Sequence, residues 1–250
     1  MRRLPVLARL VVLALLVAPA GCGSDDGGDE GPTLTVLAAA SLTDVFEELG
    51  DLFEEQHDAT VRFSFGSSTD LAEQAADGAP GDVLATADET SMQVAEDAGV
   101  AGEVETFATN ALVIVTPPDD PAGIRSLDDL AGATWVRCAD EAPCGRVALA
   151  VLEDHGVTAE PASLEEDVRA TLDKVVSGEA DAALVYATDA VAAGDAVRTV
   201  EVPGAESELT SYVVTVLGQS EDADLARRWV DLVRSEEGRQ VLRDAGFGTP

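Results

Sequence analysis

The feature that most constrains how this chain can fold is a regular alternation between short apolar runs and longer segments of helical periodicity. The apolar runs are candidate strands, and they occupy residues 34–38, 60–65, 83–85, 111–116, 134–137, 182–185 and 211–217. The candidate helices occupy residues 42–57, 69–77, 89–98, 126–130, 146–155, 165–177 and 222–245. Alternation of this kind is typical of α/β folds, in which helices cover the faces of a sheet.

The chain is long enough for one large domain or for two lobes with a core each, because it has 250 residues of which 46% are hydrophobic. No internal repeat or second linker follows residue 32, so two lobes would have to share the chain through crossovers. A proline-rich loop after the strand at 111–116 opens a second unit, and Pro203 and Gly204 mark a return to the first. We therefore predict one lobe from residues 33–109 and 204–250, and another from residues 110–203.

The ionisable residues are strongly unbalanced, with 48 Asp and Glu against 15 Lys and Arg and a formal net charge of -33. Such a surface repels nucleic acid and anionic lipid headgroups, so we expect no nucleic-acid partner. The acidity indicates a solvated surface rather than a specific cation site.

The N-terminus has the pattern of an export signal over residues 1–21, with arginines, an apolar run at 10–18 and then small residues. The apolar run is too short to span a bilayer as a stable helix. Residues 22–32 begin with Cys22 and are then polar and rich in glycine, which predicts a flexible tether. The arrangement resembles a bacterial lipoprotein signal, which implies lipid on Cys22 and anchoring to the outer face of the cell membrane. Ordinary cleavage nearby, giving a free periplasmic protein, is the alternative.

Two further cysteines, Cys138 and Cys144, lie close together in the segment CADEAPC. In an exported protein such a pair forms a disulfide more often than a metal site, and no histidine stands nearby to complete a zinc shell. The two histidines, His57 and His155, fall near the ends of helical segments, where we expect them on the surface. That placement removes the usual general base of a hydrolase.

Four segments place small or hydroxylated residues where a strand or loop gives way to a helix: AAASLTD, FGSSTDL, APCGRVAL and SLEEDVRA. Three of them have the S-x-x-D/E spacing of a capping box, with serines at 41, 67 and 163, and Pro143 predicts a helix start in the fourth. The first turn of a helix has unpaired backbone N–H groups and partial positive charge. Several such turns around one cleft could bind an anion without lysine or arginine, although each alone is only a helix cap.

These four segments, together with LVYATDA, resemble the molybdate-binding proteins of ABC transporters in order and spacing, from about residue 34 to residue 247. The resemblance implies the type II periplasmic binding protein fold, an α/β fold of two lobes joined by two crossovers, with a ligand cleft between them. The lobes of that fold close over the ligand by a hinge motion.

Carried over position by position, the resemblance implies five ligand-binding residues. Ser41 and Ser68 would offer hydroxyl and backbone N–H donors, Cys144 and Val168 would offer backbone N–H donors, and Tyr186 would offer its hydroxyl. A fully deprotonated dianion accepts hydrogen bonds and donates none, so a cage of donors suits molybdate or tungstate. None of the five positions is a carboxylate, which argues against phosphate, whose proton needs an acceptor.

The resemblance thus implies a substrate-binding protein that captures a small oxyanion and delivers it to the permease and ATPase subunits of an importer. It implies no catalysis and no cofactor, and we expect a monomer that touches the membrane only through its lipid. A receptor for sulfate, thiosulfate or another small anion is the alternative within the class. An exported serine hydrolase is an alternative from another class, but the chain has no G-x-S-x-G motif.

Overall fold

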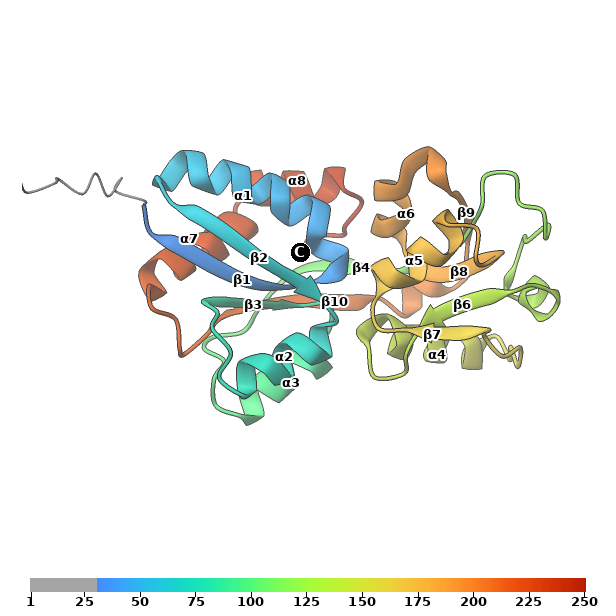
Figure 1. Cartoon of the computed structure of the whole chain (residues 1–250), viewed down its shortest axis with the longest axis horizontal. Helices are drawn as coiled ribbons and strands as arrows, with labels where there is room; N and C mark the ends of the chain where they lie inside the picture. Colours follow the sequence, from blue (N-terminus) through green and yellow to red (C-terminus); the bar gives the residue numbers. More distant parts are fainter. Residues whose placement is uncertain (1–30) are drawn as a thin grey trace, which may run out of the picture. The chain divides into compact units, whose positions relative to one another are not determined.

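The computed structural model describes residues 31–250, which form two five-stranded sheets with helices packed against them (Figure 1). The predicted export signal and Cys22 lie outside the described residues, as does most of the predicted tether. No helix of residues 31–250 is both long and apolar enough to cross a membrane.

Lobe I, as we name it, is built on the sheet of order β2-β1-β3-β10-β4. Strand β1 runs parallel to β2 and β3, whereas β10 runs antiparallel to β3 and β4. Its strands are β1 (Thr33–Ala39), β2 (Thr60–Gly66), β3 (Val83–Thr86), β4 (Glu105–Asn110) and β10 (Thr210–Val216). Its helices are α1 (Thr43–His57), α2 (Ser68–Ala76), α3 (Glu89–Asp97), α7 (Ala223–Arg234) and α8 (Glu236–Asp244).

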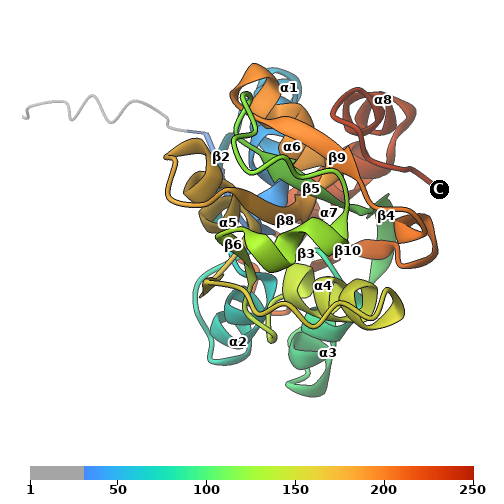
Figure 2. The same ribbon diagram turned by 90° about the vertical axis from the view of Figure 1, so that its right-hand side faces the viewer.

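Lobe II is built on the sheet of order β7-β6-β8-β5-β9. Strand β6 runs parallel to β7 and β8, and β5 runs antiparallel to β8 and β9. Its strands are β5 (Leu112–Thr116), β6 (Trp135–Cys138), β7 (Ser163–Glu165), β8 (Ala182–Tyr186) and β9 (Arg198–Glu201), and its helices are α4 (Pro143–Asp154), α5 (Val168–Val176) and α6 (Ala187–Ala193). In Figure 2, which looks onto this lobe, α4 and α6 lie on opposite sides of β8.

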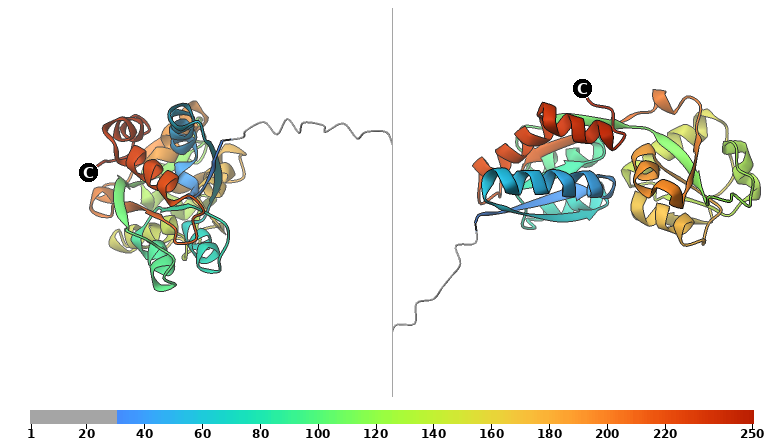
Figure 3. Two further views of the ribbon diagram at one scale, coloured as in Figure 1. Left: turned by 90° about the vertical axis from the view of Figure 1, so that its left-hand side faces the viewer. Right: turned by 90° about the horizontal axis from the view of Figure 1, so that it is seen from above.

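The chain crosses between the lobes twice. It passes from β4 to β5 through Ala111, and it returns from β9 to β10 through residues 202–209. The crossings lie beside each other, because Asn110 pairs with Thr210 in the ladder between β4 and β10 (Figure 3). Two α/β lobes joined by two crossovers are the fold class that the sequence predicted, and that prediction is confirmed.

The core of lobe I explains why residues 43–57 form an amphipathic helix. Val45, Phe46, Leu49 and Phe53 recur at spacings of three and four, and all are buried. Phe46 and Phe53 pack edge-on against Trp229 of α7, with ring centroids 5.3 and 5.5 Å apart. Burial of each such side chain contributes about 1.5–3 kcal/mol, so this face is structural.

Several predicted element bounds were wrong. The segment 126–130 lies within a 3-10 helix, Leu127–Gly132, rather than an α-helix. The helix predicted at 222–245 is two helices, because Ser235 ends α7 and caps α8 through a bond from the Gly238 N–H to its Oγ. The strands β4, β7 and β9 and the helix α6 were not predicted, since each is short or polar.

The predicted caps were also partly wrong. Ser41 lies in the 3-10 turn Ala40–Leu42, and Ser67 occupies the N-cap position of α2 without a side-chain bond to the helix. Helix α5 begins at Val168 rather than 165, and its cap is Asp167, not Ser163. Pro143 does begin α4, as predicted.

Candidate functional site

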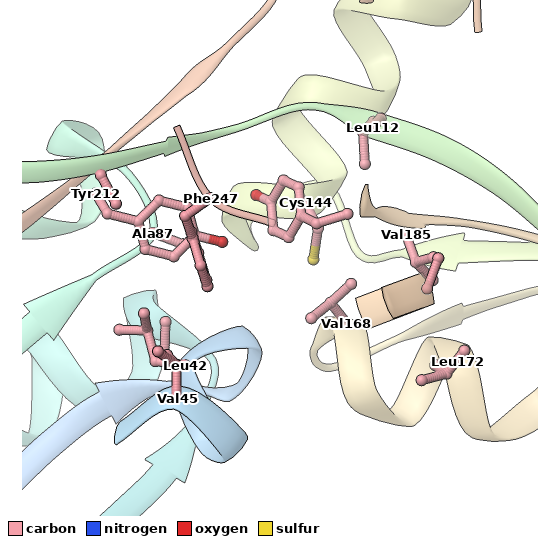
Figure 4. Close-up of a cluster of buried hydrophobic side chains, with 14 of the residues drawn as sticks. Leu42, Val45, Ala87, Leu112, Cys144, Val168, Leu172, Val185, Tyr212 and Phe247 are labelled. Carbon is pink, nitrogen blue, oxygen red and sulfur yellow. The ribbon is translucent and has the colours of Figure 1, made fainter. Parts of the chain in front are cut away.

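The five positions that the resemblance singled out meet around one cavity between the lobes. The cavity is lined by the residues that follow parallel strands and begin helices: Ala39, Ala40, Ser41, Gly66, Ser67, Ser68 and Ala87 from lobe I, and Ala142, Pro143, Cys144, Asp167, Val168 and Tyr186 from lobe II. This edge, at the carboxyl ends of the strands, is where open α/β sheets bind ligands. Figure 4 shows Cys144 and Val168 close together on the lobe II side, facing Leu42 and Ala87 of lobe I.

The cavity is small and closed. A volume of about 10 Å³ is open to the centre of a water molecule, which is room for about one water, so a larger ion would need the lining to move outward slightly. Ser41, Ser68, Cys144, Val168 and Tyr186 are each less than 5% exposed. A ligand held there would be removed from bulk water. Hydrogen bonds and dipoles act more strongly on it inside the cavity, because the effective dielectric constant is lower than in water.

A larger hollow of about 570 Å³ lies on lobe I, and Glu103, Arg227 and Asp231 form part of its lining. All three side chains are exposed, so this groove lacks the desolvation of the closed cavity. The chemistry of a small, tightly held ligand belongs to the closed cavity.

Hydrogen bonds behind Ser41 hold its hydroxyl at the edge of the cavity. The Asn110 Oδ1 accepts from the Ala111 N–H at 3.0 Å, so its Nδ2 faces Thr188 Oγ1 and the Tyr212 hydroxyl, at 2.8 and 3.3 Å. The Tyr212 hydroxyl lies 2.7 Å from Ser41 Oγ, and either oxygen can be the donor of this bond. When Tyr212 donates, its proton has an acceptor and the Ser41 proton is free to point into the cavity.

Ser68 is oriented in the same sense. Its Oγ accepts from the Ala87 N–H at 3.0 Å, which leaves the Ser68 hydroxyl proton free to donate. Ser68 is also the first residue of α2, where the backbone N–H has no acceptor within the helix. Both donors that the sequence assigned to Ser68 are therefore available.

In lobe II, Cys144 and Val168 are the second and first residues of α4 and α5, so their N–H groups also lack intrahelical acceptors. Among the α-helices of residues 31–250, α4 and α5 alone have no acidic residue in the first turn. In so acidic a chain, this leaves the positive end of the α4 dipole without a carboxylate where it reaches the cavity, whereas at α5 the only carboxylate is that of the N-cap residue, Asp167.

The loop that presents Cys144 is held rigidly. A disulfide joins Cys144 to Cys138 at the end of β6, and the Cys138 Sγ lies 3.4 Å from Thr171 Oγ1 on α5. Gly145 is required by the same close packing, because a Cβ there would lie 1.8 Å from the Ala139 carbonyl oxygen. The disulfide thus connects the first turns of both helices that face the cavity.

Tyr186 has a buried hydroxyl without a hydrogen-bond partner in the described part of the chain. Burial raises the pKa of this hydroxyl well above its usual value, and the nearby Tyr212 and Asp88 add to the shift. Tyr186 is therefore a neutral donor at every physiological pH. A buried donor that lacks a partner costs free energy, and a ligand oxygen in the cavity would relieve that cost.

Asp167 is a lining residue that sequence reasoning missed. Its Oδ1 accepts from the N–H groups of Arg169 and Ala170 at 2.8 and 2.9 Å, as an ordinary helix cap. The predicted helix at 165–177 placed Asp167 inside its first turn, which concealed its role as the cap of a helix that begins at Val168. The lining is therefore not free of carboxylates, although none of the five proposed positions is one.

The lining of the cavity consists of hydroxyl, amide, apolar and carboxylate groups and includes no histidine. Neither histidine lines the cavity: His57 stacks on Phe53, and the His155 Nε2 lies 2.8 Å from the Pro203 carbonyl oxygen. Within residues 31–250, no cluster of His, Cys, Asp and Glu could hold a metal ion. Neutral donors around a closed cavity can bind an anion, and the two lobes can enclose it.

This combination of two joined lobes with a donor-lined cavity between them defines a substrate-binding protein. The chain belongs to the family of bacterial extracellular solute-binding proteins, whose model matches residues 34–248. It is 36% identical over 261 residues to the molybdate-binding protein ModA of Mycobacterium tuberculosis, a match that covers 100% of both chains. It is 27% identical to the putative ABC transporter substrate-binding lipoprotein YvgL of Bacillus subtilis, over 95% of this chain and 96% of that one.

Solved structures show the same fold. The periplasmic molybdate-binding protein of Azotobacter vinelandii has a TM-score of 0.79 at 22% identity, covering 87% of this chain and 99% of that chain. The sulfate-binding protein SubI of Mycobacterium tuberculosis has a TM-score of 0.75 at 20% identity, covering 87% of this chain and 86% of that chain. At these identities the two likenesses concern the fold alone.

Proposed function

We propose that this chain is the extracytoplasmic receptor of a molybdate importer and that it binds molybdate, and tungstate equally, in the cavity between its lobes. The observation that carries the proposal is the convergence of Ser41, Ser68, Cys144, Val168 and Tyr186 on one closed cavity. Full-length identity of 36% to a molybdate-binding protein supports the choice of ligand.

The chemistry of the cavity suits a doubly charged anion that carries no proton. Each proposed contact is a neutral N–H or O–H donor, and such an ion accepts at every oxygen. The formal net charge of -33 opposes an approaching anion, so affinity has to come from helix dipoles and donors in the desolvated cavity. Donor geometry offers little means of rejecting tungstate, which has nearly the same size and charge.

Sulfate and phosphate are the rival ligands. Sulfate stays an alternative, because the chain has the fold of a sulfate-binding protein. Sulfate is smaller than molybdate, so the size of the cavity would have to discriminate between the two ions. Phosphate needs an acceptor for its proton, and Asp167 is the lining residue that could provide one. The Asp167 Oδ1 accepts two N–H groups as the cap of α5, so only its Oδ2 could accept the proton of phosphate, and binding measurements with both anions decide between them.

The protein would act as a carrier and catalyse nothing. It would deliver the ion to permease and ATPase subunits as a monomer, with residues 33–109 and 204–250 as one lobe and 110–203 as the other. Likeness to a substrate-binding lipoprotein supports the proposal that Cys22 carries a lipid that anchors the chain outside the cell membrane.

Calorimetry on the soluble domain with molybdate, tungstate, sulfate and phosphate tests this function. We expect tight binding of molybdate and tungstate and at least about 100-fold weaker binding of the other two, which corresponds to about 3 kcal/mol. Tight binding of sulfate or phosphate alone would overturn the choice of ligand. Ester hydrolysis that disappears in Ser41→Ala would instead support the exported hydrolase.

A further inference from the structure

Two arginines reach across the cleft from lobe II to lobe I. The Arg146 Nε donates to Asp88 Oδ2 at 2.8 Å, and its Nη2 donates to Ser91 Oγ at 2.8 Å. Arg169 forms an ion pair with Asp44 on α1. Arg146 and Asp88 are 28% and 15% exposed, so their pair is only partly hydrated. Arg169 is 27% exposed and its partner Asp44 is 59% exposed, so the second pair is well hydrated on one side.

Each arginine comes from the helix turn that supplies a proposed lobe II donor. Arg146 follows Cys144 by two residues in α4, and Arg169 directly follows Val168 in α5. A movement of either helix toward lobe I therefore moves a donor and an arginine together.

The carboxylates that pair with these two arginines lie close in sequence to the proposed lobe I donors. Asp44 follows Ser41 by three residues. Asp88 follows Ala87, whose N–H holds the Ser68 hydroxyl in place. Each interlobe contact therefore joins the chain segment of a lobe II donor to the chain segment of a lobe I donor.

Neither arginine is placed to stabilise its own helix. A positive side chain in the first turn opposes the helix dipole, and the other α-helices of residues 31–250 all have an acidic residue there. Arg146 and Arg169 thus oppose the dipoles of α4 and α5. Arg146 forms its ion pair with Asp88 of the other lobe. Arg169 pairs with Asp44 of the other lobe and with Asp189 of its own. The pairs with Asp88 and Asp44 exist only when the lobes are together.

We propose that Arg146 and Arg169 are closure latches, which form when the lobes close and set how long the oxyanion stays bound. This inference rests on the proposed function, because it concerns the same cavity. The arginines touch no ligand; they position the donor-bearing turns by holding the two lobes against each other. Their charges are paired in the closed state, so they slow ligand release rather than speed ligand capture.

The experiment measures the release rate of molybdate by stopped-flow fluorescence in Asp44→Asn, Arg146→Gln and the double variant. Asp44 is chosen over Arg169 because Arg169 also lies 3.0 Å from the buried Asp189, which its loss would leave unpaired. We expect release to be about 3-fold faster in Asp44→Asn, because that variant loses a largely exposed ion pair. We expect release to be about 10-fold faster in Arg146→Gln, because that variant loses charged hydrogen bonds that are partly buried. The two effects should multiply in the double variant, because the contacts share no residue.

Arg227→Gln is the matched control, since Arg227 pairs with Asp224 at 2.9 Å on the exposed face of α7, and neither residue lines the cavity between the lobes. It should leave the release rate unchanged. High salt should speed release from the unsubstituted protein but not from the double variant, because the screened contacts are absent there. The melting temperature without ligand should stay the same in all variants.

The outcomes separate the two proposals. If the unsubstituted protein binds no molybdate, the proposed function itself fails. If it binds molybdate but both latch variants release the ion at the unsubstituted rate, the latch proposal alone is overturned. A slower association rate with unchanged release would also overturn it, because the arginines would then attract the anion and not hold the lobes.

Discussion

Replacing Tyr186 with phenylalanine should change affinity and stability in opposite senses. The variant removes a hydroxyl that is buried and has no partner in residues 31–250, while the ring keeps its packing. Hydrogen bonds to a charged acceptor are worth about 1.5–3 kcal/mol, so the dissociation constant for molybdate should rise roughly 10- to 150-fold. The free energy of unfolding without ligand should stay constant or rise by up to about 1 kcal/mol, because no protein hydrogen bond is lost.

Tyr212→Phe is the matched control, since Tyr212 is the other tyrosine of the chain and its hydroxyl bonds to Ser41 and Asn110. That variant should lower the free energy of unfolding by about 1–3 kcal/mol, because it leaves buried polar groups unpaired. Urea denaturation and calorimetry on both variants check the pair. If Tyr186→Phe binds molybdate as tightly as the unsubstituted protein, or loses as much stability as Tyr212→Phe, Tyr186 is a structural residue and the reasoning fails.

Three further predictions concern stability. Burial raises the pKa of Asp189 to about 7 despite Arg169 nearby, so the carboxyl binds more protons in the folded than in the unfolded state between about pH 4 and 7. The stability that this protonated carboxyl contributes is fully present below about pH 4 and is lost as the pH rises through about 7. Denaturation at several pH values should show that the free energy of unfolding falls by roughly 4 kcal/mol more in the unsubstituted protein than in Asp189→Asn. The same pH dependence in both proteins would contradict this. The double variant Cys138→Ser, Cys144→Ser should have a free energy of unfolding about 2 kcal/mol lower in urea denaturation, because the disulfide no longer closes a seven-residue loop. It should also bind molybdate more weakly. Unchanged binding would show that the disulfide does not position the donors. Asp120→Ala removes a carboxylate that pairs with Arg125 and Arg198 and accepts from the Ile124 N–H. It should cost about 1–2 kcal/mol in thermal unfolding, because both arginines stay in contact with water, and an unchanged stability would refute that role.

Local sequence patterns predicted the strands that are continuous apolar runs, such as 34–38 and 182–185, because full burial leaves a strong signal. They missed β4 and β9, whose sequences ETFATN and RTVE mix polar residues into short strands. They also missed the break at Ser235, since apolar residues continue on both sides of it and a single cap residue decides it.

The candidate site could be predicted only in part. Capping spacings pointed to helix starts near 41, 67 and 163, and Pro143 to a fourth, but no local pattern says that these starts face one another. Their meeting depends on two crossovers and on the pairing of β10 with β3 and β4, which are long-range contacts. The resemblance to a known family supplied that information.

The residues behind the site were beyond prediction for the same reason. Asn110 stands among apolar residues at the end of a strand, which marks it as unusual, but its partners Thr188 and Tyr212 are 78 and 102 positions away. The contacts of Arg146 and Arg169 with lobe I likewise span 58 and 125 positions. Only the folded chain brings these groups together.

A crystal structure of the molybdate-loaded protein, phased on the anomalous signal of molybdenum, tests the central claim most directly. We predict one metal peak in the cavity between the lobes, with oxygens about 2.7–3.2 Å from the Tyr186 hydroxyl and from the Cys144 and Val168 nitrogens. A peak held elsewhere by arginine or carboxylate side chains, with this cavity empty, would contradict the account.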